Sequence, residues 1–307
     1  MKRLARTIDL LAVQAPPLPI GTPFAVFAQA ARDWVAAAPG IDLLVLPELH
    51  LFHPEGATIE ACNAALNAAA EPLDGPTDRA LSALAAELGV VLVPGTLCER
   101  GANGELFNTA RVYGRDGAVL ATYRKVFPWR PSEPYDPGDR FVVFDLPGKG
   151  RIGLTICYDA WFPEVTRQVA WMGAELVLNL VKTTTPDRPQ EIVLARAGAI
   201  ANQLYMLSLN VAGPVGQGHS LLVDPEGAVM AECAGAQPGQ LRMTLDLDTV
   251  TACRTHGTCG ENRPWLQFRP GEAKIALPAY NGYIDPARWA PPGLAQPGDT
   301  PDTETQA

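Results

Sequence analysis

The 307-residue sequence has no excess of basic residues and no long apolar run. Its 24 Lys and Arg residues are outnumbered by 33 Asp and Glu residues, giving a net charge of −9. That balance argues against nucleic acid or an anionic membrane surface as a partner. No apolar stretch reaches the roughly 18 residues that a membrane-crossing helix needs. The sequence also lacks a glycine-rich loop that opens a helix and could hold a phosphate group.

Cysteine is sparse for the length of the chain. Six cysteines in 307 residues do not make a disulfide scaffold, so a reducing cytoplasm is the expected location and leaves a thiol free to react. The spacing Cys253-x-x-His256-x-x-Cys259 could suit zinc, but no fourth ligand is near in sequence. We therefore expect no metal site and no cofactor.

What the sequence does contain is an alternation of apolar strands and amphipathic helices. Helices are predicted at residues 23–38, 77–88, 163–172 and 189–201. Strands are predicted at residues 7–13, 41–46, 90–96, 141–146, 152–157, 174–181, 204–211, 220–223 and 228–232. An Asp116-Gly117 pair marks a further hairpin between residues 108 and 123. This order predicts an α/β fold with mixed sheets and helices outside them.

No internal repeat and no linker divides the chain. Residues 1–285 are therefore predicted to form a single domain. Residues 286–307 are rich in Pro, Gly, Asp and Thr and have little to bury, so they are predicted to form a tail or an arm that contacts another subunit.

Three polar residues stand where an apolar strand or a hairpin ends: Glu48, Lys125 and Cys157. Each has a structural explanation when taken alone, as a helix cap, a solvated amine or a small buried side chain. Together they supply a base, an ammonium and a nucleophile for acyl transfer, and the backbone amide of Tyr158 could be a second donor to the oxyanion. A helix beginning just after Cys157 would also favour its thiolate.

The order and spacing of these residues resemble the nitrilase superfamily of carbon–nitrogen hydrolases. The matching signatures are Leu46-Pro47-Glu48, Tyr123-Arg124-Lys125 and the run from Ile152 to Glu164 around Cys157. The resemblance extends from about residue 6 to residue 246. It implies a four-layer αββα sandwich with mixed β-sheets, and subunits that pair into a homo-oligomer.

The loop from Tyr123 to Gly138 is similar to that of the aliphatic amidase and formamidase branch. The resemblance implies that Glu133 is a second acidic residue that positions the substrate near the cysteine. It also implies substrate contacts for the residues Tyr158, Trp129, Trp161 and Thr183. The expected reaction is hydrolysis of a small carboxamide to a carboxylate and ammonia through a cysteine thioester, with Glu48, Lys125, Cys157 and Glu133 as catalytic residues.

Other activities stay open on this scaffold. An N-carbamoyl hydrolase and an acyltransferase could use the same thioester, and a pseudoenzyme or assembly protein could retain the fold without the chemistry. Tyr158-Asp159 stands where nitrilases proper carry Trp-Glu, which counts against a nitrile substrate. The particular amide, its stereochemistry and the number of subunits do not follow from the sequence.

Overall fold

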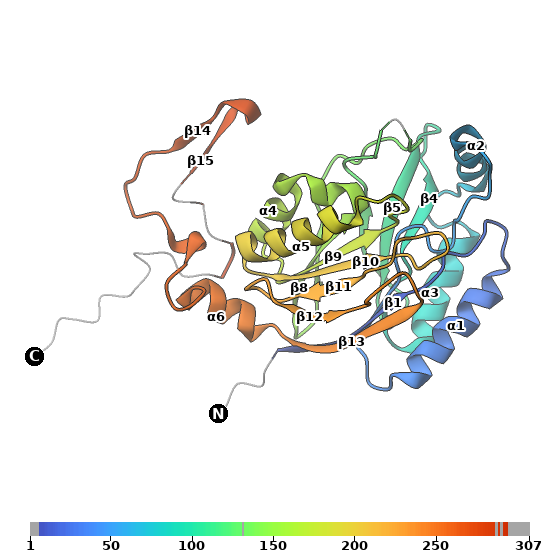
Figure 1. Cartoon of the computed structure of the whole chain (residues 1–307), viewed down its shortest axis with the longest axis horizontal. Coiled ribbons are helices and arrows are strands. Elements are labelled where there is room, and N and C mark those ends of the chain that lie inside the picture. Colours follow the sequence, from blue (N-terminus) through green and yellow to red (C-terminus); the bar gives the residue numbers. More distant parts are fainter. Residues whose placement is uncertain (1–5, 131, 286–287, 289–290, 294–307) are drawn as a thin grey trace, which may run out of the picture.

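The computed structural model describes residues 6–130, 132–285, 288 and 291–293. Two mixed sheets dominate it (Figure 1). The strands of the first sheet are β1 (Thr7–Gln14), β2 (Leu43–Val45), β3 (Val91–Val93), β4 (Thr96–Arg100), β5 (Leu106–Tyr113), β6 (Val119–Arg124) and β13 (Gly239–Asp246). They run in the order β13-β1-β2-β3-β5-β4, with β6 paired to β5.

The second sheet has the order β12-β11-β10-β9-β8-β7. Its strands are β7 (Val143–Leu146), β8 (Gly150–Ile156), β9 (Leu176–Val181), β10 (Tyr205–Asn210), β11 (Leu221–Val223) and β12 (Val229–Glu232). The helices are α1 (Phe24–Ala37), α2 (Ile59–Ala69), α3 (Pro76–Leu88), α4 (Pro163–Trp171), α5 (Arg188–Asn202) and α6 (Asp248–His256). A short 3-10 helix, η1 (Cys157–Trp161), joins β8 to α4.

The strand pleat divides the apolar residues between layers. Leu10 and Leu43 point between the two sheets, whereas their neighbours Leu11 and Leu44 point toward α1 and α3. In the second sheet Leu178 joins the core between the sheets, and Val177 packs toward α4 and α5. The predicted four-layer αββα sandwich with mixed sheets is therefore confirmed.

Parallel pairing brings the ends of separate strands to one edge. β1, β2 and β3 are mutually parallel neighbours, and so are β8, β9 and β10. Glu48 follows β2 and Cys157 follows β8, so each lies beyond the carboxyl end of a parallel strand. α/β proteins concentrate reactive groups at this edge.

One predicted strand is divided in the structure. Residues 90–96 were expected to form one strand, but β3 ends at Val93 and β4 begins at Thr96. Gly95 lies between them with φ +92°, and a Cβ atom there would lie 2.0 Å from the Pro47 carbonyl oxygen. Only glycine permits this close approach of the chain to the turn that carries Glu48. The turn at Gly95 therefore separates the two strands.

Several elements were not predicted. α2 buries only Leu66 among its residues, and β13, which pairs with β1 from Thr7↔Asp246 to Gln14↔Gly239, lies in a stretch that was left unassigned. α6 and a small hairpin of β14 (Ile275–Leu277) and β15 (Gly282–Ile284) follow, and the hairpin stands away from the sandwich (Figure 1). The division into 1–285 and 286–307 stays a prediction, since most of the tail lies outside the described residues.

Within the described ranges, every helix is too short or too polar to cross a bilayer.

Candidate active site

A buried lysine joins the two predicted carboxylates. Lys125 follows β6 and has no exposed surface. Its Nζ lies 3.1 Å from Oε1 of Glu48 and 2.8 Å from both carboxylate oxygens of Glu133. The ammonium therefore holds together a residue that follows β2 and a residue from the loop after β6.

Each carboxylate is also held by a second donor. Asn108 on β5 donates from Nδ2 to Oε1 of Glu48 at 2.7 Å, and its carbonyl oxygen accepts the backbone N–H of Lys125 at 2.9 Å. The backbone N–H of Trp129 donates to Oε2 of Glu133 at 2.7 Å. These contacts fix both carboxylates around the ammonium, as a preorganised site requires.

Cys157 lies at the same cluster. It is the first residue of η1, and its φ of +47° is in the left-handed region that a residue other than glycine rarely adopts. The charges of Glu48, Lys125 and Glu133 all act on its thiol. The structure thus brings together the four residues Glu48, Lys125, Glu133 and Cys157. A left-handed residue at a reactive position indicates strain retained for function.

The protonation of the cluster follows from burial and charge. Burial, and then the negative charge of Glu48, raise the pKa of the Cys157 thiol well above its ordinary value. The expectation that the nearby helix start favours a resting thiolate is therefore wrong. Burial disfavours the Lys125 ammonium, but the charges of Glu48 and Glu133 outweigh it and raise its pKa. Burial raises the pKa of Glu48 against the opposing charge of Lys125.

Asp159 connects the cysteine turn to the lysine loop. Its carboxylate accepts hydrogen bonds from the backbone N–H of Ile156 and Phe127 and from the hydroxyl of Tyr123, at 2.7 to 2.9 Å. Burial raises its pKa to about 6. Because Tyr123 precedes Lys125 by two residues and Ile156 precedes Cys157, one side chain sets the distance between the nucleophile and the ammonium.

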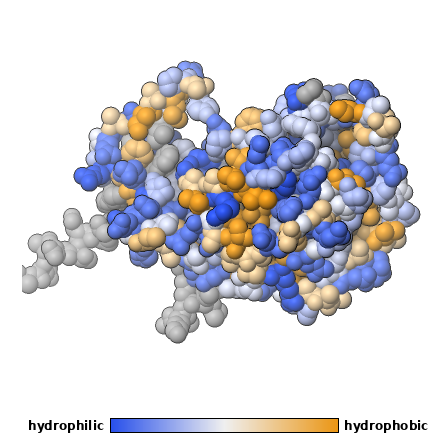
Figure 2. Space-filling model, in the orientation of Figure 1, coloured by the Kyte–Doolittle hydropathy of each residue, from blue (hydrophilic) through white to orange (hydrophobic). Residues whose placement is uncertain are grey.

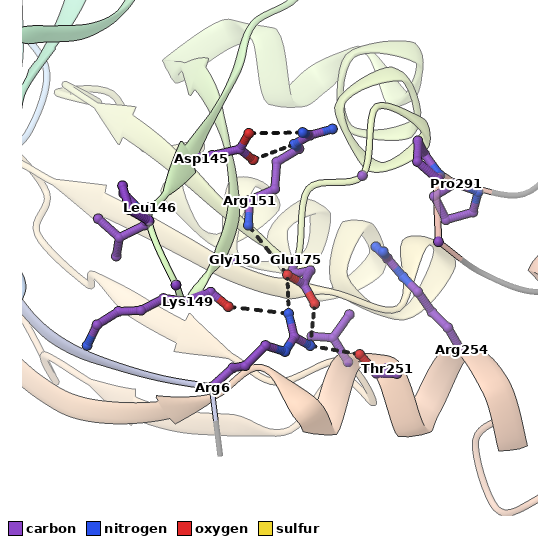
Figure 3. A pocket seen from close by; sticks show the side chains of 16 residues that line it. Arg6, Asp145, Leu146, Lys149, Gly150, Arg151, Glu175, Thr251, Arg254 and Pro291 are labelled. Atoms are coloured by element: carbon purple, nitrogen blue, oxygen red, sulfur yellow. Dashed lines mark hydrogen bonds and ion pairs between the residues drawn. The ribbon is translucent and has the colours of Figure 1, made fainter. Parts of the chain in front are cut away.

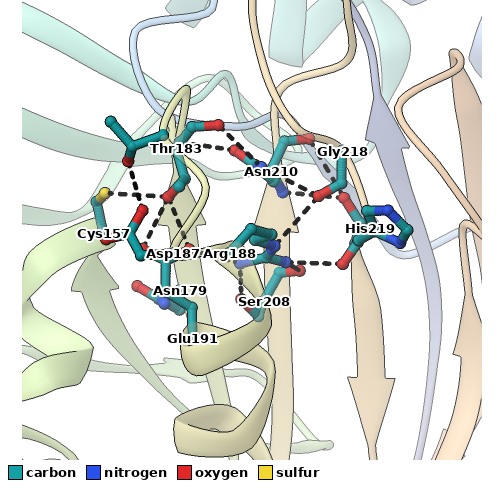
Figure 4. Close-up of polar contacts among 12 residues, drawn as sticks. Cys157, Asn179, Thr183, Asp187, Arg188, Glu191, Ser208, Asn210, Gly218 and His219 are labelled. Carbon is teal, nitrogen blue, oxygen red and sulfur yellow. Dashed lines mark hydrogen bonds and ion pairs between the residues drawn. The ribbon is translucent and has the colours of Figure 1, made fainter.

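The predicted substrate-binding residues surround Cys157 unequally. Thr183 follows β9, and its Oγ1 lies 4.0 Å from Sγ of Cys157 (Figure 4). Tyr158 and Trp161 lie on η1 with ring centroids 6.1 Å apart, beside Phe162. Trp129 is 40% exposed, and its backbone rather than its ring contacts Glu133. Thr183 is therefore the predicted binding residue whose side chain has a polar contact with the sulfur.

Four polar residues of the site were not predicted from the sequence. Lys182 follows β9 as Glu48 follows β2, so the same strand-end signal was available for it. Burial lowers the pKa of Lys182 against the opposing charge of Glu48. Glu191 and Arg188 pair within one turn of α5, a spacing that sequence can suggest. Asn108 lies inside a hairpin strand, where nothing in the pattern distinguishes it.

A cavity of about 650 Å³ lies elsewhere (Figure 3). Arg6, Arg151 and Arg254 line it, together with the turn between β7 and β8. That turn precedes β8, whereas Cys157 follows the strand, so the rise of a seven-residue strand places the cavity about 20 Å from the thiol. The ion pairs drawn in Figure 3, Arg6 with Glu175 and Arg151 with Asp145, form its walls.

Comparison with known proteins assigns a family to this geometry. The chain is 31% identical over 225 residues to a formamidase of Pseudomonas syringae pv. syringae (strain B728a), covering 71% of this chain but only 64% of that relative's length. It is 33% identical over 236 residues to omega-amidase NIT2-A of Xenopus laevis, covering 71% of this chain and 82% of the relative.

Solved structures agree with the sequence relatives. Nit3 of Saccharomyces cerevisiae, a member of branch 10 of the nitrilase superfamily, superposes with a TM-score of 0.72 at 27% identity, covering 83% of this chain and 95% of that one. A mutant amidase of Nesterenkonia sp. AN1, with the acetamide moiety of fluoroacetamide added covalently at its active site cysteine, superposes with a TM-score of 0.67 at 27% identity and covers 81% and 93%. Residues 7–255 match the model of the carbon–nitrogen hydrolase family. The chain therefore belongs to the carbon–nitrogen hydrolase family, within the nitrilase superfamily.

Proposed function

We propose that this protein is an amidase that hydrolyses a small carboxamide to a carboxylate and ammonia through a thioester on Cys157. The observation that carries the proposal is a buried lysine held between two carboxylates, with all three charges acting on the thiol of Cys157. The relatives support it, since they include a formamidase and an omega-amidase. So does the cysteine adduct in the Nesterenkonia amidase.

The first half of the reaction needs a base beside the sulfur. Because the resting thiol of Cys157 keeps its proton, sulfur can attack the carbonyl carbon only as that proton leaves. Glu48 accepts the proton, since its charge acts directly on the thiol and its own pKa is raised by burial. A carbon–sulfur bond forms, and the carbonyl π electrons move to oxygen.

Lys125 stabilises the oxyanion that results. The two oxygens of Glu133 share one side of the ammonium and Glu48 takes another, which leaves a third N–H direction for the substrate oxygen. Glu133 thereby fixes the direction of the remaining donor rather than moving a proton. This is the positioning role proposed for Glu133.

The second half regenerates the site. Glu48 gives its proton to the amide nitrogen as the carbon–nitrogen bond breaks, and ammonia leaves a thioester on Cys157. Water then attacks the thioester carbon while Glu48 takes a water proton, and the carbon–sulfur bond breaks. That proton returns to sulfur, so one carboxamide and one water yield one carboxylic acid and one ammonia.

The test is ammonia release from a panel of short aliphatic, aromatic and amino-acid amides. We expect the intact protein to release ammonia from at least one of them, and Cys157→Ala to lower the rate by at least about 1000-fold. Cys233→Ala, at a half-buried cysteine that follows β12 and lies outside the site, is the matched control. Mass spectrometry of the quenched reaction should find an acyl adduct on Cys157, and an active Cys157→Ala variant would refute the thioester.

We also propose a homo-oligomer in a reducing compartment such as the cytoplasm, where the thiol would stay free. Figure 2 shows apolar side chains gathered on the face that carries α5 and the strands beside it. The exposed large apolar residues of α5 and β12 are Val193, Ile200, Val229 and Met230. A grouped apolar surface of this kind favours contact with another protein surface, here a second copy of the chain.

A further inference from the structure

We infer that Thr183 is held as a hydrogen-bond acceptor for the amino group of the substrate, and that it thereby selects amides over the corresponding esters. The inference rests on the proposed amidase function and adds a determinant of specificity to it. Three residues carry it: Thr183, Glu191 and Arg188 (Figure 4).

The hydroxyl of Thr183 lies between the nucleophile and a buried carboxylate. Its Oγ1 is 2.7 Å from each carboxylate oxygen of Glu191 and 4.0 Å from Sγ of Cys157. Thr183 and Glu191 are each 5% exposed. The hydroxyl therefore has two polar neighbours in a site that excludes most water. It can donate a hydrogen bond to only one of them.

The hydrogen goes to Glu191. An ionised carboxylate can only accept, so the contact at 2.7 Å requires Thr183 to donate. A hydroxyl has one hydrogen and two lone pairs, and once that hydrogen is committed the side facing Cys157 presents lone pairs alone. At rest the sulfur of Cys157 lies 4.0 Å from this side of the hydroxyl. When sulfur bonds to a substrate carbon, they are free for another donor.

Arg188 keeps Glu191 in place. Its Nη1 donates to Oε2 of Glu191 at 3.0 Å and to the Ser208 hydroxyl at 3.0 Å. Its other nitrogens donate to the backbone carbonyls of Gly218, Ser208 and His219. Figure 4 shows these contacts converging on one guanidinium. An arginine anchored to three carbonyl groups keeps its charge and its direction, so Glu191 stays an acceptor.

The backbone of Thr183 is fixed as firmly as its side chain. Asn210 accepts the backbone N–H of Thr183 at 2.8 Å through Oδ1 and donates to its carbonyl at 3.3 Å through Nδ2. Neither end of the Thr183 residue can turn without breaking one of these bonds. The acceptor is therefore preorganised before a substrate arrives.

The reacting carbon has one substituent for each side of the site. In the proposed mechanism its oxygen faces the ammonium of Lys125, while the sulfur lies 4.0 Å from Thr183 and within reach of the charges of Glu48 and Lys125. The inference places the amino nitrogen, rather than the acyl chain, against Thr183, which accepts one N–H and leaves the nitrogen lone pair for Glu48, the proton donor. An ester presents an oxygen without hydrogen at this position, and two facing acceptors repel each other.

The experiment compares one amide that the intact protein hydrolyses with its methyl ester, in Thr183→Val and Thr183→Ser. Valine matches the shape of threonine without the hydroxyl, and serine restores the hydroxyl. We expect Thr183→Val to lower kcat/KM for the amide by about 10-fold or more, because one hydrogen bond is lost in a buried site. For the ester, the value should stay the same or rise, since the variant breaks no bond to the ester and removes an acceptor that repels its oxygen. Thr183→Ser should keep the amide-to-ester ratio of the intact protein.

Glu191→Gln gives a second, independent readout. Arg188 orients the glutamine carbonyl toward itself, so the amide nitrogen faces Thr183 and donates to it. The hydroxyl hydrogen then turns toward the substrate and favours an ester oxygen, so the amide-to-ester ratio should fall below that of the intact protein. A folding defect lowers both rates together and leaves their ratio unchanged.

The outcomes separate this inference from the proposed function. An intact protein that hydrolyses no amide would refute the amidase itself, and the inference with it. An intact protein that hydrolyses amides, with a ratio unchanged in Thr183→Val and Glu191→Gln, would refute the inference alone. A ratio that falls in both variants and is kept in Thr183→Ser establishes the acceptor.

Discussion

Two buried carboxylates flank Cys157, and their surroundings differ in one decisive respect. Glu48 shares a lysine with a second carboxylate, so two negative charges face one positive charge. Glu191 has an arginine of its own, and that pair is neutral. Burial and the charge of Glu133 raise the pKa of Glu48 and so favour its protonated form, whereas the charge of Arg188 offsets that of Glu191.

The supporting contacts differ in the same sense. Lys125 is bonded to groups that can change charge, and the carboxylate charges raise its pKa against the effect of burial. Arg188 is bonded to three backbone carbonyls, a hydroxyl and one carboxylate. A site that moves protons needs the first arrangement, and a site that holds a hydroxyl still needs the second. Cys157 lies between the two.

We call the cluster of Lys125, Glu48 and Glu133 the lysine side. The largest effect should come from removing proton exchange there. Glu48→Gln keeps the size of the side chain but cannot take a proton from the thiol, so we expect amide hydrolysis to fall by about 1000-fold. Steady-state ammonia release measures it.

The matched control for this variant is Glu99→Gln. Glu99 is as buried as Glu48 and is ion-paired to Arg124, but it lies outside the cluster at Cys157. We expect this variant to keep its activity per folded molecule. Equal losses in the two variants would mean that burial of a charge, rather than proton transfer, explains the effect at Glu48.

A smaller effect concerns the resting thiol. Because the pKa of Cys157 is raised, its ionised fraction should grow about tenfold for each pH unit until that pKa is reached. Modification by methyl methanethiosulfonate, which carries no amide, should therefore accelerate about 100-fold from pH 7 to pH 9. Mass spectrometry of the Cys157 peptide measures the rate at this cysteine alone. A plateau below pH 9 would show that the charges around the sulfur favour the thiolate after all.

The sequence predicts the lysine side better than the arginine side, which consists of Thr183, Glu191 and Arg188. Glu48, Lys125 and Cys157 each follow a strand or hairpin that apolar patterning reveals, and parallel strands bring such positions to one edge. The contact of Thr183 with Glu191 depends instead on where α5 lies beside β9, which no local pattern encodes.

Pairing between segments far apart in the sequence was equally hard to predict. β13 alternates polar and apolar residues, but only the folded sheet reveals that it completes β1 along its whole length. α2 buries one residue and so has almost no apolar face to detect. The divided strand at Gly95 depends on a contact with Pro47, which belongs to another part of the chain.

Glu133 gives the smallest effect and the sharpest test of which lysine-side groups move protons. Glu133→Gln retains an oxygen for Lys125 or for the Trp129 N–H, but it removes one of the two negative charges on the ammonium. We expect amide hydrolysis to fall by about 10-fold, because Lys125 loses its fixed direction while Glu48 still exchanges protons.

The same substitution should change the thiol in the opposite direction. The charge of Glu133 contributes to the raised pKa of Cys157, so its removal lowers that pKa and should speed modification by methyl methanethiosulfonate at pH 8. Turnover that falls while labelling rises cannot come from unfolding, since unfolding would also expose the buried Cys98 and Cys253 to the reagent. If Glu133→Gln instead lost as much activity as Glu48→Gln, Glu133 would be a proton carrier, and the lysine side would have two of them.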